Sequence, residues 1–161
     1  MTSDSMSEKK GLYTVAAESY DLVLVSVIDS PSPHVFRAKV ECVYSSGKGI
    51  TPDNLGAEIV FNGGPPTWGN VALQAGERAL LFVRAQAGAL NEYPSRGHMV
   101  QEDMDGELGA RLHVPELWLR EDVPEAVKAA ARQHPTWRNA SIVKFSVLES
   151  YLKGLIARAG R

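Results

Sequence analysis

Residues 57–84 read AEIVFNGGPPTWGNVALQAGERALLFVR, and this stretch decides the fold. Its two ends, residues 57–61 and 78–84, are short apolar runs that contain β-branched and aromatic side chains, a pattern typical of β-strands. The loop between them cannot continue a sheet ladder, because Pro65 and Pro66 have no backbone N–H to donate. Trp68 lies in this loop among glycines, which permit positive φ. The stretch predicts two scaffold strands that carry an unusual loop.

Two further strands are expected upstream of this stretch. Residues 21–28 are almost continuously apolar, which in so short a run favours a strand buried on both faces. Residues 34–44 alternate between apolar side chains such as Phe36 and charged side chains such as Arg37, which indicates one core face and one wet face. A turn with two prolines joins the two segments, so we expect an antiparallel hairpin.

Downstream, the chain changes from strands to helices. Residues 96–102 and 108–114 are weaker strand candidates, and Asp105-Gly106 between them is a hairpin signal. Residues 124–134 and 141–157 are predicted helices. The second predicted helix carries an apolar stripe that should pack on the sheet. The stripe consists of Phe145, Leu148, Leu152, Leu155 and Ile156.

These elements predict a mainly β protein with α+β order. We expect a five- to six-stranded antiparallel OB-like β-barrel with a C-terminal amphipathic helix and one further short helix. Residues 1–11 are polar and should be disordered. Residues 12–161 should form a single domain, in which 12–120 make the barrel and 121–161 make a helical cover.

Composition excludes several classes of protein. The chain of 161 residues has a formal net charge of −2, so it offers no overall basic field to a nucleic-acid backbone. Its single cysteine, Cys42, excludes an intrachain disulfide and is expected to be a buried, inert thiol. No run reaches the ~20 apolar residues of a membrane span, and the polar start is no signal-peptide core. We therefore expect a cytoplasmic protein.

The order of the strands resembles that of the netrin-like (TIMP-like) OB-fold modules. Residues 20–27 are similar to their first strand and residues 34–44 to their second. Residues 73–83 place Gly-Glu before an apolar strand, as the fourth strand of that family does. The resemblance implies a barrel and a general role in binding other macromolecules. It does not imply metalloprotease inhibition, because those members chelate zinc through an N-terminal cysteine and this chain begins Met1-Thr2.

No local motif for catalysis or metal binding stands out. There is no Gly-x-Ser-x-Gly elbow, and the loop Ser45-Ser46-Gly47-Lys48-Gly49 lacks the spacing of a phosphate-binding loop. The histidines have no spacing that would favour a shared metal ion. They are His34, His98, His113 and His134. We therefore expect no metal, no cofactor and no enzymatic activity.

Two regions are candidates for binding another protein. The first is the loop with Pro65, Pro66, Thr67 and Trp68, since tryptophan is enriched at interface hot spots. Trp68 has an alternative role as a plug for one end of the barrel. The second region is an acidic turn, which could steer basic partners or be merely solvated. Its carboxylates are Glu102, Asp103, Asp105 and Glu107.

The sequence as a whole favours a non-enzymatic protein-binding module that acts by protein–protein contact. By analogy, such a module could be a toxin-neutralising immunity protein or an inhibitor. One alternative is an OB-fold protein that binds single-stranded nucleic acid, although nucleic acid is disfavoured by the charge. A second alternative is a small hydrolase with a non-local site, which would need His98 or His113 beside a carboxylate in a pocket. The partner and the oligomeric state stay open.

Overall fold

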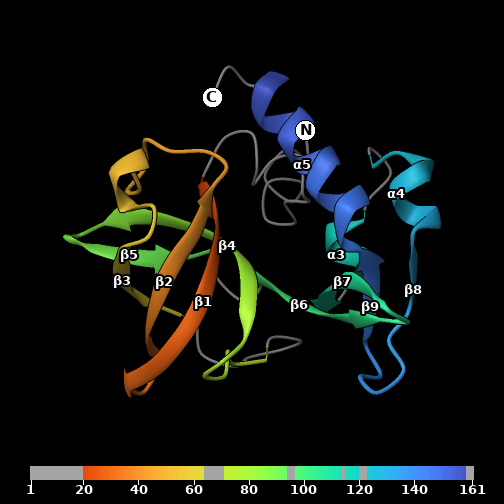
Figure 1. Cartoon of the computed structure of the whole chain (residues 1–161), viewed down its shortest axis with the longest axis horizontal. Helices are drawn as coiled ribbons and strands as arrows, with labels where there is room; N and C mark the ends of the chain where they lie inside the picture. The colour runs from red at the N-terminus through yellow and green to blue at the C-terminus, as the bar shows by residue number, and fades with distance from the viewer. Residues whose placement is uncertain (1–19, 64–70, 94–96, 114, 120–122, 159–161) are drawn as a thin grey trace, which may run out of the picture.

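The structure is a computed structural model, and it describes residues 20–63, 71–93, 97–113, 115–119 and 123–158 (Figure 1). The predictions for residues 1–11 and for the loop with Trp68 lie outside these residues. The described strands are β1 (Asp21–Ser32), β2 (Val35–Val43), β3 (Glu58–Asn62), β4 (Arg78–Gln86), β5 (Ala89–Glu92), β6 (His98–Met104), β7 (Glu107–His113), β8 (Ala131–Gln133) and β9 (Ala140–Lys144). The described helices are the 3₁₀ turn η2 (Pro52–Asn54) and the α-helices α3 (Pro115–Trp118), α4 (Glu125–Ala129) and α5 (Phe145–Arg158).

Five strands close into a barrel. Their order is β1-β2-β3-β5-β4, and β4 pairs back onto β1 to complete the ring. The closing pair runs antiparallel from Asp21 opposite Val83 to Ser26 opposite Arg78. The neighbours are antiparallel except for β3 and β5, which form a short parallel pair. The expected mainly β fold with an OB-like barrel is therefore confirmed, and so is the hairpin of β1 with β2.

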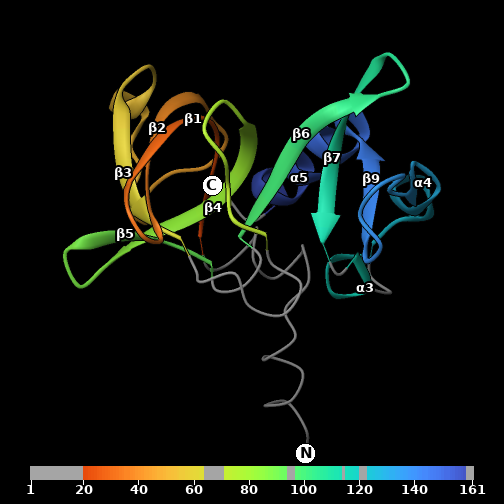
Figure 2. The ribbon, with the colours of Figure 1, turned by 90° about the horizontal axis from the view of Figure 1, so that it is seen from below.

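The sheet continues beyond the barrel as an extension. Strand β4 also pairs with β6, and the order from there is β7, β9 and β8. Helix α5 covers one face of this extension, and Figure 2 shows it behind β6 and β7. The chain thus has a barrel on one side and a helix-covered sheet on the other, joined through β4 (Figure 1).

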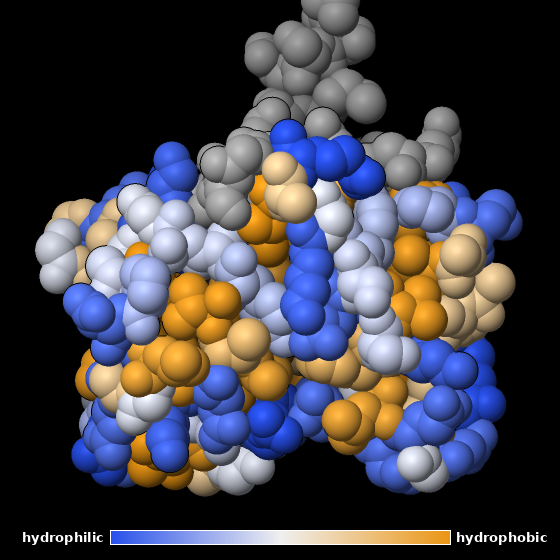
Figure 3. Space-filling model, turned by 45° about the horizontal axis from the view of Figure 1, so that its top comes forward, coloured by the Kyte–Doolittle hydropathy of each residue, from blue (hydrophilic) through white to orange (hydrophobic). Residues whose placement is uncertain are grey.

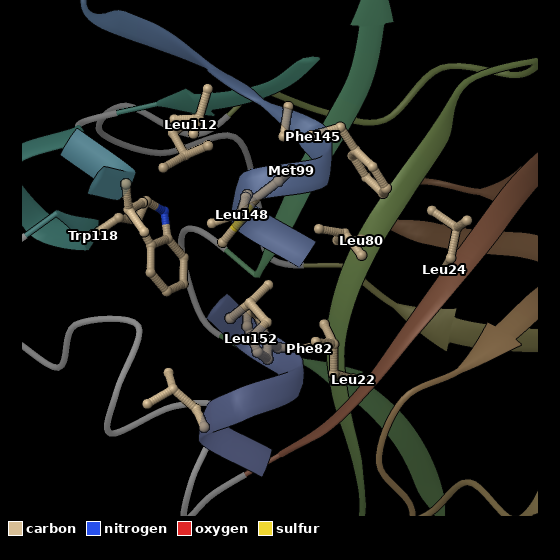
Figure 4. Packing of buried hydrophobic residues seen from close by; sticks show 14 of the residues in the cluster. Leu22, Leu24, Leu80, Phe82, Met99, Leu112, Trp118, Phe145, Leu148 and Leu152 are labelled. Atoms are coloured by element: carbon tan, nitrogen blue, oxygen red, sulfur yellow. The ribbon is translucent and has the colours of Figure 1, made fainter. Parts of the chain in front are cut away.

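Two hydrophobic cores meet at β1 and β4. Inside the barrel, β1 contributes Val23 and Val25 to the first core. On the outside of the barrel, β1 contributes Leu22 and Leu24 to the second core, which includes the stripe of α5. Figure 4 shows these leucines and Leu80 on the side of the strands that faces α5. The expectation that β1 is buried on both faces is confirmed.

The C-terminal third contains more strand than the sequence predicts. The helix expected over residues 124–134 ends at Ala129, and residues 131–133 form β8. The helix expected over residues 141–157 begins only at Phe145, because β-branched Ile142 and Val143 pair with β7 instead. Tertiary pairing overrides local helix propensity in both segments. Strand β5, for which the sequence predicts no strand, pairs with β3 on one side and β4 on the other.

The apolar stripe of α5 should control stability. We expect Leu152→Ala to lower the free energy of unfolding by about 2–5 kcal/mol, because Leu152 is buried in the second core and its removal leaves a cavity. Ser150→Ala, an exposed change on the same helix, should alter it by less than about 0.5 kcal/mol. Denaturant unfolding of both variants measures the difference. An equal loss in the two variants would contradict this packing.

Candidate functional site

His98 and Glu92 form a buried pair at the end of the barrel. Their side chains are only 3% and 1% exposed, and His98 Nδ1 contacts a carboxylate oxygen of Glu92. On the other side of the ring, Nε2 lies 2.7 Å from the carbonyl oxygen of Val71, which only accepts hydrogen bonds. The pair is closely surrounded, since a Cβ added at Gly97 would lie 2.3 Å from Glu92 Cγ. Both ring nitrogens are engaged within the protein.

This arrangement favours a protonated ring at His98. Burial by itself lowers the pKa of His98, but the charge of Glu92, its hydrogen bond and the Val71 carbonyl together outweigh burial and raise that pKa above 6.5. An imidazolium can donate from both nitrogens, which matches the two acceptors. The pair therefore ties β5 to β6 and to the segment that precedes β4.

A second polar network lies on the face of the extension that α5 does not cover. Its centre is Arg111 on β7, which is buried and forms an ion pair with Glu102 on β6. Glu77 lies 3.8 Å from the same guanidinium. The ring of Trp137 stacks over this guanidinium at 5.2 Å, and His113 meets that ring edge-on. The network is thus a cluster of charged side chains around the buried Arg111, beneath the half-exposed Trp137.

In this network the hydrogen bonds of His113 and His134 indicate neutral imidazole rings. His134 Nδ1 accepts hydrogen bonds from the backbone N–H groups of Thr136 and Trp137, both at 3.0 Å. Its Nε2–H must therefore donate to Glu102 at 2.6 Å. His113 Nε2 accepts from Arg111 Nε–H at 2.9 Å. Burial and the charge of Arg111 lower the pKa of His113 to about 4.

These contacts leave His134 no free ring nitrogen with which to act as a general base. The hydrolase alternative required His98 or His113 in a pocket beside a carboxylate. His98 does meet a carboxylate, but the pair is sealed from solvent. Neither histidine lines either of the two hollows described below. Within the described ranges, no group of three or more metal-ligating side chains gathers in one place.

The predicted acidic turn is divided among several ion pairs. Glu102 belongs to the buried Arg111 network, whereas Asp103 is exposed and accepts a bond from the Gly106 N–H. Asp105 pairs with Arg132 of β8, and Glu107 lies 3.4 Å from Lys144 of β9. The structure thus places Asp105 and Glu107 beside each other, whereas Glu102 lies apart from them in the network around Arg111. No local pattern in the sequence indicates these cationic partners, because they come from distant strands.

A hollow of about 480 Å³ lies between this turn and α4. It forms because β7 pairs with β9 only from Gly109 onward, so the hairpin of β6 and β7 projects past the end of β9 (Figure 2). Small or apolar side chains form part of its lining: Ala126, Ala129, Ala130, Ala131, Met104 and Val147. The residues of two ion pairs, Asp105–Arg132 and Glu107–Lys144, complete the lining. The hollow thus combines small apolar side chains with charges of both signs.

The other candidate residues have varied outcomes. Pro65, Pro66, Thr67 and Trp68 lie outside the described residues, so their role stays a prediction. Cys42 is half-buried rather than fully buried as expected. Of the two remaining tryptophans, Trp118 is a core residue. Trp137 lies half-exposed over Arg111.

The face of β2 that could bind nucleic acid is already paired with carboxylates. Arg37 contacts Asp29 and approaches Glu58 at 3.9 Å. Arg78, which lies beside this face on β4, pairs with Glu41 at 3.1 Å. A groove for single strands needs free cations interleaved with stacking aromatic rings. This face of the described barrel does not have that arrangement.

Comparison of the chain with protein-family models, with curated proteins and with solved structures found no match. The resemblance to netrin-like modules stays a prediction, carried by the strand order alone. Among the described residues, no helix is long and apolar enough to cross a membrane.

The His98–Glu92 pair should make the protein less stable as pH rises above 6.5. Because the folded pKa of His98 is raised, the folded state binds more protons than the unfolded state above pH 6.5. The stabilisation is complete below this value and is lost as pH rises through the folded pKa. We expect the free energy of unfolding to decrease as pH rises above 6.5. We expect His98→Gln to make this pH dependence weaker. An unchanged slope in denaturant titrations of the variant would contradict the assignment.

His113 should give the opposite dependence in acid. Its folded pKa of about 4 lies below the ordinary 6.5, so the unfolded state binds more protons between these values. Stability should therefore decrease as pH falls from 6.5 to about 4. Replacing His113 with Gln should reduce this loss. NMR titration of the His113 ring provides a direct check. A titration midpoint near pH 6.5 would contradict the lowered pKa of this ring.

Proposed function

We propose that this protein is a non-enzymatic binding module that acts by contact with another protein. The observation that carries the proposal is the hollow between the β6–β7 turn and α4, which is lined by small apolar side chains and by charged ones. Protein interfaces likewise combine apolar contact area with polar and charged groups. Two carboxylates predicted as binding residues, Asp105 and Glu107, stand at this hollow.

The hollow is suited to an apolar side chain flanked by polar groups. The four alanines offer a shallow surface that a larger side chain can fill, which is how many interface anchors bind. Asp105 and Arg132 are largely exposed and supply both signs of charge to a partner's rim. Leu108 on the same hairpin is 52% exposed and adds apolar area nearby. Figure 3 shows that hydrophobic residues reach the surface elsewhere as well, in patches bordered by hydrophilic ones.

The proposal extends to a subclass, a cellular location and a second contact region. A toxin-neutralising immunity protein or an inhibitor is the subclass we propose by analogy with other small binding modules. A cytoplasmic location is proposed with it, because the single cysteine cannot form an internal disulfide. The loop with Trp68 is proposed as a second contact region, on the strength of its composition.

A matched pair of variants tests the hollow. Ala126→Arg places a long cation in the hollow, whereas Ala157→Arg makes the same change at an exposed position on α5 that does not line it. We expect the immobilised protein to capture a specific protein from its native cell, with at least about tenfold less recovered by Ala126→Arg. Ala157→Arg should recover as much as the wild type.

The melting temperatures of the two variants should match, which separates binding from folding. A Trp68→Ala variant in the same experiment tests the loop independently. If no protein is captured, or if both arginine variants capture it equally, the proposed role of the hollow is wrong.

A further inference from the structure

Strand β2 runs past the end of its neighbour β3. The two strands pair from Val35 opposite Asn62 to Lys39 opposite Glu58. Two more backbone bonds join Val40 to Ala57 and Gly56, at 2.9 and 2.8 Å. Beyond Val40, no strand in the described part of the chain pairs with β2 on the side away from β1. The last residues of β2 therefore form an open strand edge within the barrel wall.

The backbone of Val43 faces this open edge. The next residue, Tyr44, donates its N–H to the Leu22 carbonyl of the N-terminal part of β1, at 2.9 Å. Hydrogen-bonding groups of successive residues in an antiparallel strand point to alternate sides. Because Tyr44 points toward β1, the N–H and C=O of Val43 point away from it. Among the described residues none is bonded to these groups, so they can pair with a new strand, as at an uncovered sheet edge.

A groove of about 380 Å³ lies along the same edge. It is lined by β2 and the residues after it, together with Pro52 and Leu55 from the η2 turn. Leu55 is 58% exposed, an unusual position for a large apolar side chain. Glu41 is the acidic side chain among the lining residues, and one of its oxygens lies 3.1 Å from Arg78. The groove thus combines an open backbone edge, an apolar wall and a carboxylate.

We propose that this groove binds an extended segment of a partner protein, which adds to the sheet as a strand beside Val43. The segment would exchange backbone hydrogen bonds with Val43 and place an apolar side chain against Leu55. A lysine or arginine of the segment would lie near Glu41, because a carboxylate has two oxygens and can accept hydrogen bonds from more than one cation. The surface lies on the barrel and shares no residue with the hollow beside α4.

The size of the surface favours a peptide segment over a second copy of the chain. The open edge covers only the end of β2, and the groove is small. A stable dimer generally buries about 1,200–2,000 Å² in total. An added strand needs much less, since its main-chain bonds supply affinity and a single pocket supplies specificity.

The free protein gives the first test. In amide hydrogen exchange followed by NMR, we expect Val43 to exchange fast and Tyr44 to exchange slowly, although the two are adjacent in the chain. The Tyr44 N–H is bonded to Leu22, whereas no carbonyl of the described residues accepts the Val43 N–H. Equal protection at both amides would show that another part of the chain covers the edge, and would overturn the proposal.

The second test uses a library of random heptapeptides displayed on phage and selected on the full chain. We expect enriched peptides with alternating apolar side chains and a lysine or arginine. A synthetic copy of the best peptide should slow exchange at Val43. Leu55→Asp should weaken its binding by at least about tenfold. Val60→Asp, the same change at a 53% exposed valine that does not line the groove, should leave affinity within about twofold.

Three results would overturn the proposal: no enrichment, binding unaffected by Leu55→Asp, or sedimentation that shows a dimer which Leu55→Asp dissociates. The last would identify a second copy as the occupant. Ala126→Arg should bind the selected peptide as the wild type does. A failure at this groove is therefore distinguishable from a failure at the hollow beside α4.

Discussion

The structure depends on two strands that are buried on both faces. Strands β1 and β4 pair with each other, and their alternate side chains enter two different cores. On β4, Leu81 and Val83 face the barrel interior, while Leu80 and Phe82 face α5. A one-residue slip in this pair would exchange the two sets, so the register is fixed from both sides. The barrel and the extension are thereby joined as one packed structure.

Two groups of charged side chains pair with each other in buried positions. Arg111, His134 and Glu102 satisfy one another on the face of the extension that α5 leaves uncovered. His98 and Glu92 do the same within the barrel end. Such buried pairs add little net stability compared with apolar packing, but each is costly to break, because one charge would be left unpaired. In both places the histidine ring, of His98 or of His134, joins neighbouring segments of the fold through its hydrogen bonds.

The two surfaces proposed for binding arise where neighbouring strands end at different points. The hairpin of β6 and β7 outruns β9, which opens the hollow lined by Ala126 and its neighbours. Strand β2 outruns β3, which opens the groove beside Leu55. In both places the sheet stops before its side chains and backbone are fully covered. Uncovered strand ends are where β proteins commonly recruit partners.

The sequence by itself determined the barrel strands β1, β2, β3 and β4, the hairpin of β1 with β2 and the apolar stripe of α5, because side-chain periodicity reports local burial. It misjudged residues 131–133 and 141–144, whose strand conformation depends on pairing with β7 and β9. It found Asp105 and Glu107 as an acidic turn, yet not their cationic partners. Only the tertiary structure decided those pairs, the buried histidines and both hollows, since each joins segments whose approach is fixed by strand order and register rather than by local pattern.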